Sequence, residues 1–303
     1  MLLNPTSVVF HELVVAPAAL FGAWVLGVRA LGRRRAALEL VAAALYGFCL
    51  ELLVMRVFAS HTYGPEWLLA PLGVPLAVAA VWAAVILAAM ALSARLGPAS
   101  PLGRATTAAT LGIALDLLME PVAMRSGLWQ WTPPGSWLGV PAGNFVGWAL
   151  IVGLYAFAAD HGEGRASSPA LQAAERLGLG AACLVAVVGV GLAWRRLGVE
   201  EAFAGRWGWA PWTAILLLSA ALRRGPATAS RVPTLSARLA TAPGPAAGVF
   251  ALVAGVFGVN AVALGDRDVL LAAAGSAAVL TWLVSRACAC PAPALSERAS
   301  SSW

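Results

Sequence analysis

Carboxylate side chains interrupt several of the long apolar runs in this 303-residue chain. Asp116 and Glu120 are four residues apart, so on a helix they share one face, about 6 Å apart along its axis. Two carboxyls that close in a medium of low dielectric share one proton, which leaves one protonated and the other ionised near neutral pH. Such an arrangement is typical of an acid and base pair.

Glu51 is a third candidate, near the middle of its own apolar run. The only basic residue near it is Arg56, five residues further on. An ionised group at the centre of a bilayer costs about 2.5–3.5 kcal/mol, so a function or a distant partner is expected. Glu39 lies closer to Arg33–Arg35 and is expected to snorkel to the interface. Glu12 is also near the end of its run and is discounted.

A structural interpretation of the acidic pair stays open beside the chemical one. In it, Asp116 or Glu120 forms an ion pair with Arg125 or Arg56 and only holds helices together. The structure must decide between the two.

Aromatic and amide groups follow the carboxylates in two connections. His61 and Tyr63 occupy a turn before Gly64 and Pro65, where they act either as interface anchors or in chemistry. The segment 129–148 is rich in Trp, Gly and Pro, and is expected to fold back over the helix ends. Within it, Asn144 and Trp148 share a helical face, where an amide can orient water or a carboxylate.

The composition indicates where these groups lie. Hydrophobic residues make up 60% of the chain and charged residues 11%, with a mean hydropathy of +0.81, whereas a soluble domain carries about 25% charge. The net charge of +6 comes from arginines placed between apolar runs rather than along one face. That pattern is typical of membrane topology and does not favour nucleic acid as a partner.

The predicted fold is an all-α, polytopic transmembrane helix bundle of about nine spans, within a range of seven to nine. A bilayer core of about 30 Å needs about 20 apolar residues per helix. We expect a single transmembrane domain over residues 1–303. The apolar runs lie near 9–31, 36–58, 72–96, 105–125, 142–160, 178–195, 208–222, 244–264 and 269–285.

Arginine placement predicts the orientation. Alternate connections divide the 20 basic residues into 14 on one side and 6 on the other, and cytoplasmic loops are enriched in positive charge. The split favours an N-terminus outside and a C-terminus in the cytoplasm, in what we expect to be a bacterial cytoplasmic membrane. Tryptophans gather on the arginine-poor side, as in an interfacial aromatic belt.

The order of these residues resembles a known family, the integral membrane carotenoid hydratases of the bisanhydrobacterioruberin hydratase and γ-carotene 1′,2′-hydratase type. The resemblance covers about residues 40–155, and the helices at 178–285 are additional to it. One departure is His61, because the family usually has a tyrosine at that position. The matching elements are Glu51, Ser60–Gly64, Gly73–Leu76 with Trp82, Asp116–Pro121, Trp129–Trp131, Gly139–Pro141, Asn144–Phe145 and Gly147–Trp148.

The resemblance implies an enzyme of carotenoid biosynthesis, a hydro-lyase that adds water to the terminal 1,2 double bond of an acyclic end group. Its product is a tertiary alcohol, it uses no cofactor and no metal, and its long isoprenoid substrate arrives from the lipid bilayer. From chemistry we assign proton transfer to Glu51, Asp116 and Glu120. The expected substrate-binding residues are His61, Tyr63, Trp129, Trp131, Asn144 and Trp148.

Two other functions fit parts of the pattern. An intramembrane prenyltransferase is one, because Asp116-x-x-x-Glu120 resembles half of an acidic Mg²⁺ site, although a second acidic motif is missing from the sequence. A non-catalytic carotenoid or lipid carrier is the other, since midplane charges also occur in transporters.

Overall fold

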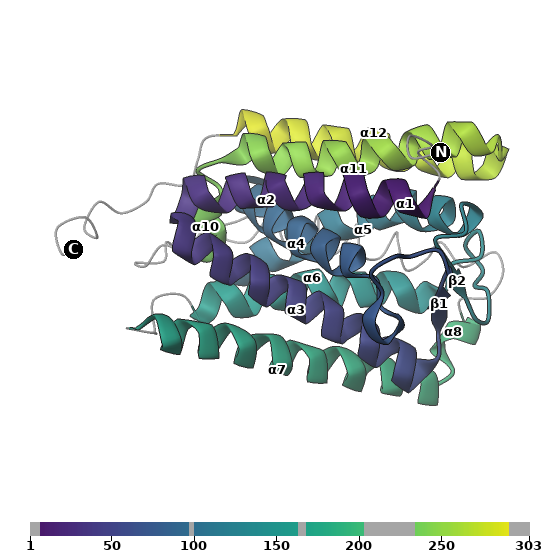
Figure 1. Cartoon of the computed structure of the whole chain (residues 1–303), viewed down its shortest axis with the longest axis horizontal. Helices are drawn as coiled ribbons and strands as arrows, with labels where there is room; N and C mark the ends of the chain where they lie inside the picture. Colours follow the sequence, from purple (N-terminus) through teal and green to yellow (C-terminus); the bar gives the residue numbers. More distant parts are fainter. Residues whose placement is uncertain (1–6, 97–99, 163–167, 203–233, 291–303) are drawn as a thin grey trace.

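The computed structural model of the chain describes residues 7–96, 100–162, 168–202 and 234–290, which form a bundle of long, roughly parallel and antiparallel helices (Figure 1). The elements in chain order are α1 (Val8–Phe10), the π-helical turn η1 (His11–Val15), α2 (Ala16–Leu31), α3 (Arg33–Phe58), β1 (His61–Tyr63), η2 (Pro71–Gly73), α4 (Leu76–Leu96), α5 (Pro101–Arg125), β2 (Trp129–Trp131), α6 (Ala142–Gly162), α7 (Pro169–Arg196), α8 (Val199–Ala202), α10 (Leu235–Leu239), α11 (Pro243–Leu264) and α12 (Arg267–Ala289).

Eight helices among the described residues are long and apolar enough to cross a membrane. They confirm the all-α polytopic prediction, and they match eight of the nine predicted apolar runs. The predicted span at 208–222 lies outside the described residues. Helices are the expected form of such segments, because lipid offers no partner for an unpaired backbone N–H or C=O.

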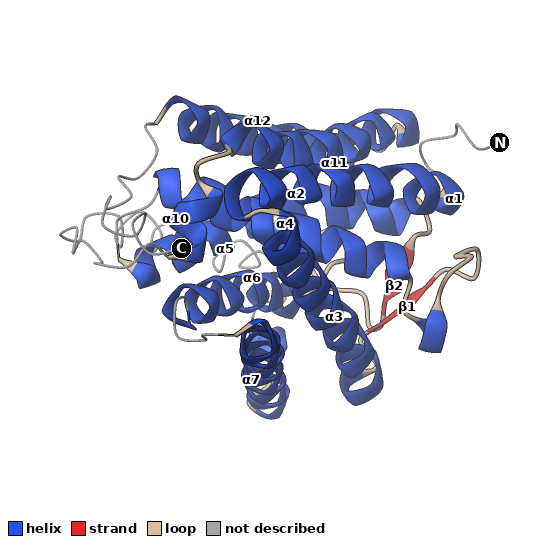
Figure 2. Ribbon diagram, turned by 60° about the vertical axis from the view of Figure 1, so that its left-hand side comes forward, coloured by secondary structure: helices blue, strands red, loops and turns tan. Residues whose placement is uncertain are grey.

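α4 and α5 form the centre of the bundle. Within the most apolar 18-residue stretch of each helix, 94% of the residues of α5 are buried in the bundle, but only 17% of those of α7. In Figure 2, α11 and α12 lie along one side and α7 lies at the opposite side. α11 and α12 pack on α4 and α5, while α7 packs on α3 and α6.

A two-stranded antiparallel sheet closes one end of the bundle. β1 follows α3, β2 follows α5, and both lie with α8 at the same end (Figure 1). We call this the sheet end, and the opposite end, where α3, α5 and α7 begin, the arginine end. α10 lies at the arginine end (Figure 1), where it packs on α4 and α2.

Buried ion pairs join the helices at the arginine end. Glu39 accepts hydrogen bonds from Arg35 Nε at 2.6 Å and from Arg176 Nε at 2.9 Å, and its side chain is fully buried. The expectation that Glu39 snorkels to the interface is therefore wrong. Its second partner, Arg176 on α7, is 137 residues away in sequence and is also buried.

A second buried pair gives a stability prediction. Arg104 Nε donates to Asp160 Oδ2 at 2.7 Å, and Asp160 Oδ1 accepts from Ser236 N at 2.8 Å, which ties α5, α6 and α10 together. The two charged side chains are only 7% and 1% exposed. Replacing Arg104 by Met leaves the buried Asp160 without its guanidinium, so we expect a loss of about 3–5 kcal/mol in the free energy of unfolding.

The control for this prediction lies on the same helix. Arg125, on α5, pairs with Asp266 at 3.2 Å, where both side chains are partly exposed, 42% and 33%. Exposed ion pairs contribute little to the free energy of unfolding, so Arg125→Met should leave stability nearly unchanged. Both variants should be measured by chemical denaturation in detergent. Equal effects of Arg104→Met and Arg125→Met would contradict this account.

Candidate active site

A cavity of about 730 Å³ lies at the sheet end of the bundle. Its wall comes from α3, α4, α5, α6, α7 and α8, from both strands, and from the connection between β2 and α6. Most of the wall is apolar or aromatic. The wall residues among the predicted site residues are Glu51, His61, Tyr63, Glu120, Trp129, Trp131, Asn144 and Trp148.

Glu51 lies on α3 with both carboxylate oxygens occupied by ring N atoms. Trp82 Nε1 donates to its Oε1 at 2.7 Å, and His61 Nε2 lies 3.1 Å from its Oε2. Gly47, one turn before Glu51, makes this possible: a Cβ at Gly47 would lie 2.6 Å from the Cβ of Trp82. The missing side chain lets α4 approach α3 closely enough for the indole to reach the carboxylate.

Gly47 therefore yields a prediction. Gly47→Ala forces Trp82 away from Glu51, and we expect a loss of about 1–3 kcal/mol in stability through overpacking, together with a loss of activity. Gly248→Ala on α11 is the matched control, because a Cβ there meets nothing within 4 Å. Both variants should be compared with the wild type by thermal unfolding in detergent. Their product formation should be measured in cells that accumulate lycopene or γ-carotene. A Gly47→Ala protein with wild-type stability and wild-type activity would contradict the close packing of α3 on α4.

The two short strands gather the aromatic residues over the carboxylates. His61 pairs with Trp131 and Tyr63 with Trp129 in antiparallel register. Successive side chains of a strand point to opposite faces, so these four rings share one face while Thr62, between them, is exposed. The ring centroids of His61 and Trp131 are 4.9 Å apart, and those of Tyr63 and Trp129 are 6.1 Å apart.

Glu120 receives two indole N–H groups from this sheet. Trp129 Nε1 and Trp131 Nε1 donate to its Oε2 at 2.9 Å and 2.7 Å. Both donors are neutral, so they stabilise a carboxylate without cancelling its charge. Glu120 is buried, yet it faces the cavity.

Asp116 lies one helical turn before Glu120 and interacts with it electrostatically. Asn144 Nδ2, at the start of α6, donates to Asp116 Oδ2 at 2.8 Å. Oδ1 of Asp116 is buried and has no hydrogen-bond partner among the described residues. Asp116 is fully buried and, unlike Glu120 and Asn144, is not part of the cavity wall.

The ion-pair interpretation of the acidic pair is wrong for the described residues. Arg125 pairs with Asp266, and Arg56 Nη2 donates to the backbone oxygen of Leu72. Neither arginine reaches Asp116 or Glu120. Among the described residues, the candidate carboxylates are held by indole, imidazole and amide groups.

His61 lies within hydrogen-bond distance of Glu51 and in the electrostatic field of Glu120, the two carboxylates that face the cavity. Burial disfavours its protonated form, but its hydrogen bond to Glu51 and the negative charges of Glu51 and Glu120 outweigh burial, so the pKa of His61 lies above its ordinary value. Its other nitrogen, Nδ1, lies 3.2 Å from Ser60 Oγ. Burial, followed by the charge of Glu51, raises the pKa of Tyr63 well above its usual value, so this phenol stays neutral.

An aromatic pair forms another part of the wall. Trp82 and Trp148 have ring centroids 4.2 Å apart with an interplanar angle of 35°. Gly112 on α5 allows this packing, because a Cβ there would lie 3.1 Å from Val152 and 3.5 Å from Trp148. The face of α6 that carries Asn144 thus also carries Trp148 into the cavity, as the spacing predicts.

Residues of α7 and α8 complete the cavity, and sequence reasoning did not find them. Val187, Val190 and Gly191 add an apolar wall. Glu200 on α8 accepts from the backbone N–H groups of Ala142 and Gly143 at 2.7 Å and 2.9 Å, and so caps α6 just before Asn144. Nothing in the local sequence pattern around Glu200 indicates this long-range cap.

Glu12 is a structural residue. Its two carboxylate oxygens accept from the backbone N–H groups of Leu68 and Leu69, each at 2.7 Å. It therefore anchors the connection between β1 and α4, which agrees with its being discounted as a chemical group.

The fold and the site together define a multi-pass helical membrane protein with a largely apolar cavity in which two carboxylates face an imidazole and several aromatic rings. The family described as carotenoid biosynthesis protein matches residues 4–195, and the chain belongs to this family. The match extends beyond the 40–155 core of the resemblance and includes α7 almost to its end. Comparisons with curated proteins and with solved structures gave no match.

Proposed function

We propose that this protein adds water across the terminal 1,2 double bond of an acyclic carotenoid end group. A proton joins C2, the oxygen of water joins C1, and the second proton of that water returns to the protein, so the product is a tertiary alcohol and no electron donor or acceptor is needed. The observation that carries the proposal is the environment of Glu51 and Glu120: both are buried and face an apolar cavity, and among the described residues neither is paired with an arginine.

Glu120 is the proton donor in this proposal. It faces the cavity, whereas Asp116 lies behind it, so Glu120 can reach C2 of an end group and Asp116 cannot. The indole N–H groups of Trp129 and Trp131 stabilise the carboxylate that remains once the proton has moved to C2. General acid catalysis of this kind contributes about 10²–10⁴ in rate.

Aromatic faces stabilise the tertiary cation that forms at C1. The rings of Tyr63, Trp131 and Trp148 belong to the cavity wall, and a cation near an aromatic face gains about 0.5–2 kcal/mol, most where water is excluded. The cation therefore survives long enough for water to reach it.

Glu51 and His61 act on the water. A neutral His61, oriented by the Glu51 carboxylate at 3.1 Å, takes a proton as the water oxygen bonds to C1. His61 and Glu120 line the same cavity, so the proton returns to Glu120 across it and resets the acid. His61 then has a chemical role, beyond the substrate contact assigned to it from the sequence, and Asn144 positions the water or the Asp116 carboxyl.

The substrate enters from lipid. A C40 polyene is about as long as the bilayer core is thick, about 30 Å, so a cavity of about 730 Å³ takes one end group while the rest of the chain stays among the helices or in the lipid. Val187, Val190 and Gly191 of the peripheral helix α7 provide an apolar wall for this end of the polyene.

We also propose that the sheet end faces the outside of the cell. Of the arginines that the structure describes, five lie at or near the sheet end and nine at or near the arginine end, namely Arg29, Arg33, Arg34, Arg35, Arg95, Arg104, Arg176, Arg238 and Arg286. The side of a membrane protein that is richer in positive charge stays in the cytoplasm. Two reporters should be fused to the C-terminus, one that is active only in the cytoplasm and one that is active only outside it. We expect activity from the first fusion and none from the second. Activity of an externally active reporter at that position would reverse the assignment.

Pigment analysis tests the reaction. The gene should be expressed in a host that accumulates lycopene or γ-carotene, and the pigments should be separated and weighed by mass spectrometry. We expect a new, more polar pigment heavier by one water. An unchanged pigment profile, with the protein present in the membrane, would contradict the hydratase proposal.

A prenyltransferase is less well supported by the site. Oxygens of Asp116 and Glu120 accept hydrogen bonds from Asn144, Trp129 and Trp131, and N–H donors at these oxygens compete with a divalent cation. Dependence of product formation on added Mg²⁺, with an isoprenoid diphosphate consumed, would favour the transferase instead.

A further inference from the structure

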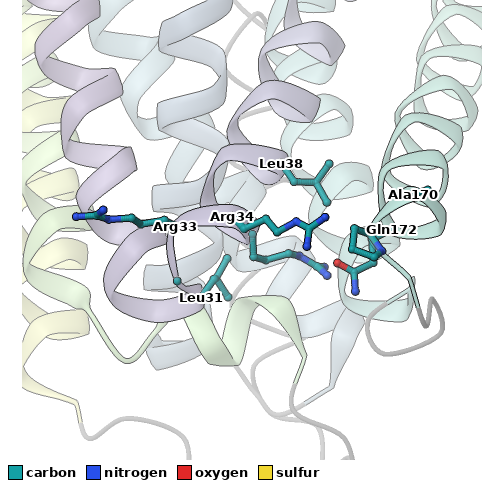
Figure 3. A pocket seen from close by; sticks show the side chains of 9 residues that line it. Leu31, Arg33, Arg34, Leu38, Ala170 and Gln172 are labelled. Carbon is teal, nitrogen blue, oxygen red and sulfur yellow. The ribbon is translucent and has the colours of Figure 1, made fainter. Parts of the chain in front are cut away.

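A second cavity, of about 570 Å³, lies at the arginine end, far along the bundle from the candidate active site. It opens between the start of α3 and the start of α7. Figure 3 shows the Arg34 side chain extending toward Ala170 and Gln172 on α7, while Arg33 points to the other side of α3. The residues that line it are Leu31, Gly32, Arg33, Arg34, Arg35, Leu38, Pro169, Ala170 and Gln172.

The charge in this cavity has one sign. Its basic residues are Arg34, Arg35 and Arg33, of which Arg33 turns its guanidinium away (Figure 3), and its wall contains no Asp or Glu. Arg35 is bonded to the buried Glu39 beneath it, whereas Arg33 and Arg34 are exposed and form no ion pair among the residues that the structure describes.

Two helix N-termini add to this positive field. α3 begins at Arg33 and α7 at Pro169, and neither has an acidic residue in its first turn. The N-terminus of a helix carries about half a positive charge, so arginines at the start of α3 oppose the helix dipole. An anion held beside the start of α3, which has no side-chain cap, would relieve this repulsion and meet backbone N–H groups there.

An exposed apolar stripe continues from Arg34 along α3. Leu38, Val41 and Leu45 follow Arg34 at intervals of four, three and four residues, so the four side chains share one helical face. Val41 is 57% exposed and Leu45 is 46% exposed. A basic group followed by an outward-facing apolar stripe matches the shape of a lipid, with a phosphate above an acyl chain.

We propose that the groove between the starts of α3 and α7 binds the phosphate of an anionic phospholipid headgroup, with one acyl chain along Leu38, Val41 and Leu45. Basic pockets between membrane helices on the cytoplasmic side are suited to such headgroups. The apolar stripe favours a lipid over a soluble phosphate, because only a lipid has an acyl chain that can lie along Leu38, Val41 and Leu45 on the face that carries Arg34. This site is independent of the proposed reaction.

Native mass spectrometry of the purified full-length protein tests the proposal, with phosphatidylglycerol and phosphatidylcholine as probes in mixed detergent micelles. We expect wild-type protein to retain phosphatidylglycerol in preference to phosphatidylcholine. Arg34→Gln should weaken phosphatidylglycerol retention about fivefold, the usual share of one arginine near an anionic lipid. The control is Arg29→Gln, because Arg29 is also exposed and lies at the same end but does not line the groove.

Two results would overturn the lipid site. Equal phosphatidylglycerol retention by wild type, Arg34→Gln and Arg29→Gln would show that the groove holds no lipid of its own. Displacement of the bound lipid by millimolar inorganic phosphate would instead identify a site for soluble anions. Circular dichroism of each variant confirms that its helices are intact, so that a loss of lipid is assigned to the groove.

Discussion

Replacing Glu120 by glutamine is expected to lower formation of the tertiary alcohol by at least about 100-fold, the lower end of the contribution of a general acid. Glutamine keeps the shape of the side chain and an oxygen that accepts the N–H groups of Trp129 and Trp131. It has no acidic proton to give to C2. Because the geometry is preserved, the loss should appear in kcat, while the KM for the carotenoid stays within a few-fold of its wild-type value.

The matched control is Glu66→Gln. Glu66 is an exposed carboxylate at the same end of the bundle and is not part of the cavity wall. Both variants should be made in the lycopene-accumulating host and then purified into liposomes for rate measurement. Wild-type turnover by a folded Glu120→Gln protein would remove Glu120 from the mechanism.

Replacing Glu51 by glutamine is expected to reduce the rate roughly 100-fold and to move its pH dependence. In the wild-type protein Glu51 raises the pKa of His61 above its ordinary value of 6.5. Activity should therefore fall as the pH drops through that raised pKa, because imidazolium cannot take a proton from water. Without the Glu51 charge, burial dominates and lowers the pKa of His61, so the acidic limb of kcat/KM moves to lower pH.

His61→Gln tests whether the acidic limb of the pH profile comes from His61. Glutamine keeps a hydrogen-bonding group beside Glu51 but does not titrate, so the acidic limb assigned to His61 should disappear along with most of the rate. An acidic limb at the same pH in wild type, Glu51→Gln and His61→Gln would show that His61 does not accept the proton.

Local spacing was enough to predict part of the site. Asp116 and Glu120 share a face of α5, and Asn144 and Trp148 share a face of α6, because helical periodicity fixes both relations within four residues. The apolar runs likewise predicted eight of the helices that the structure describes. These features depend on neighbours in sequence, which a single chain displays directly.

Contacts between distant segments could not be predicted in this way. The strands β1 and β2 are only three residues each, too short to show an alternating pattern, yet their pairing brings His61 next to Trp131. The Glu200 cap on α6 depends on how α7 brings α8 next to the start of α6 at the sheet end.

The burial of Glu39 also depends on a residue that is distant in sequence. Its sequence neighbours Arg33–Arg35 suggested an interfacial position, but its burial depends on Arg176 on α7. A residue's distance from the end of its apolar run therefore says little about its burial when a partner on another helix supplies the opposite charge.

The origin of the product hydroxyl tests the central claim most directly. Purified protein in liposomes should be given lycopene or γ-carotene in ¹⁸O-labelled water under ordinary oxygen, and in ordinary water under ¹⁸O₂, and the product should be weighed by mass spectrometry. We predict that the hydroxyl carries ¹⁸O only in labelled water and that the product also forms without oxygen. A hydroxyl labelled from ¹⁸O₂ would contradict proton-initiated hydration by Glu120 and would make the protein an oxygenase.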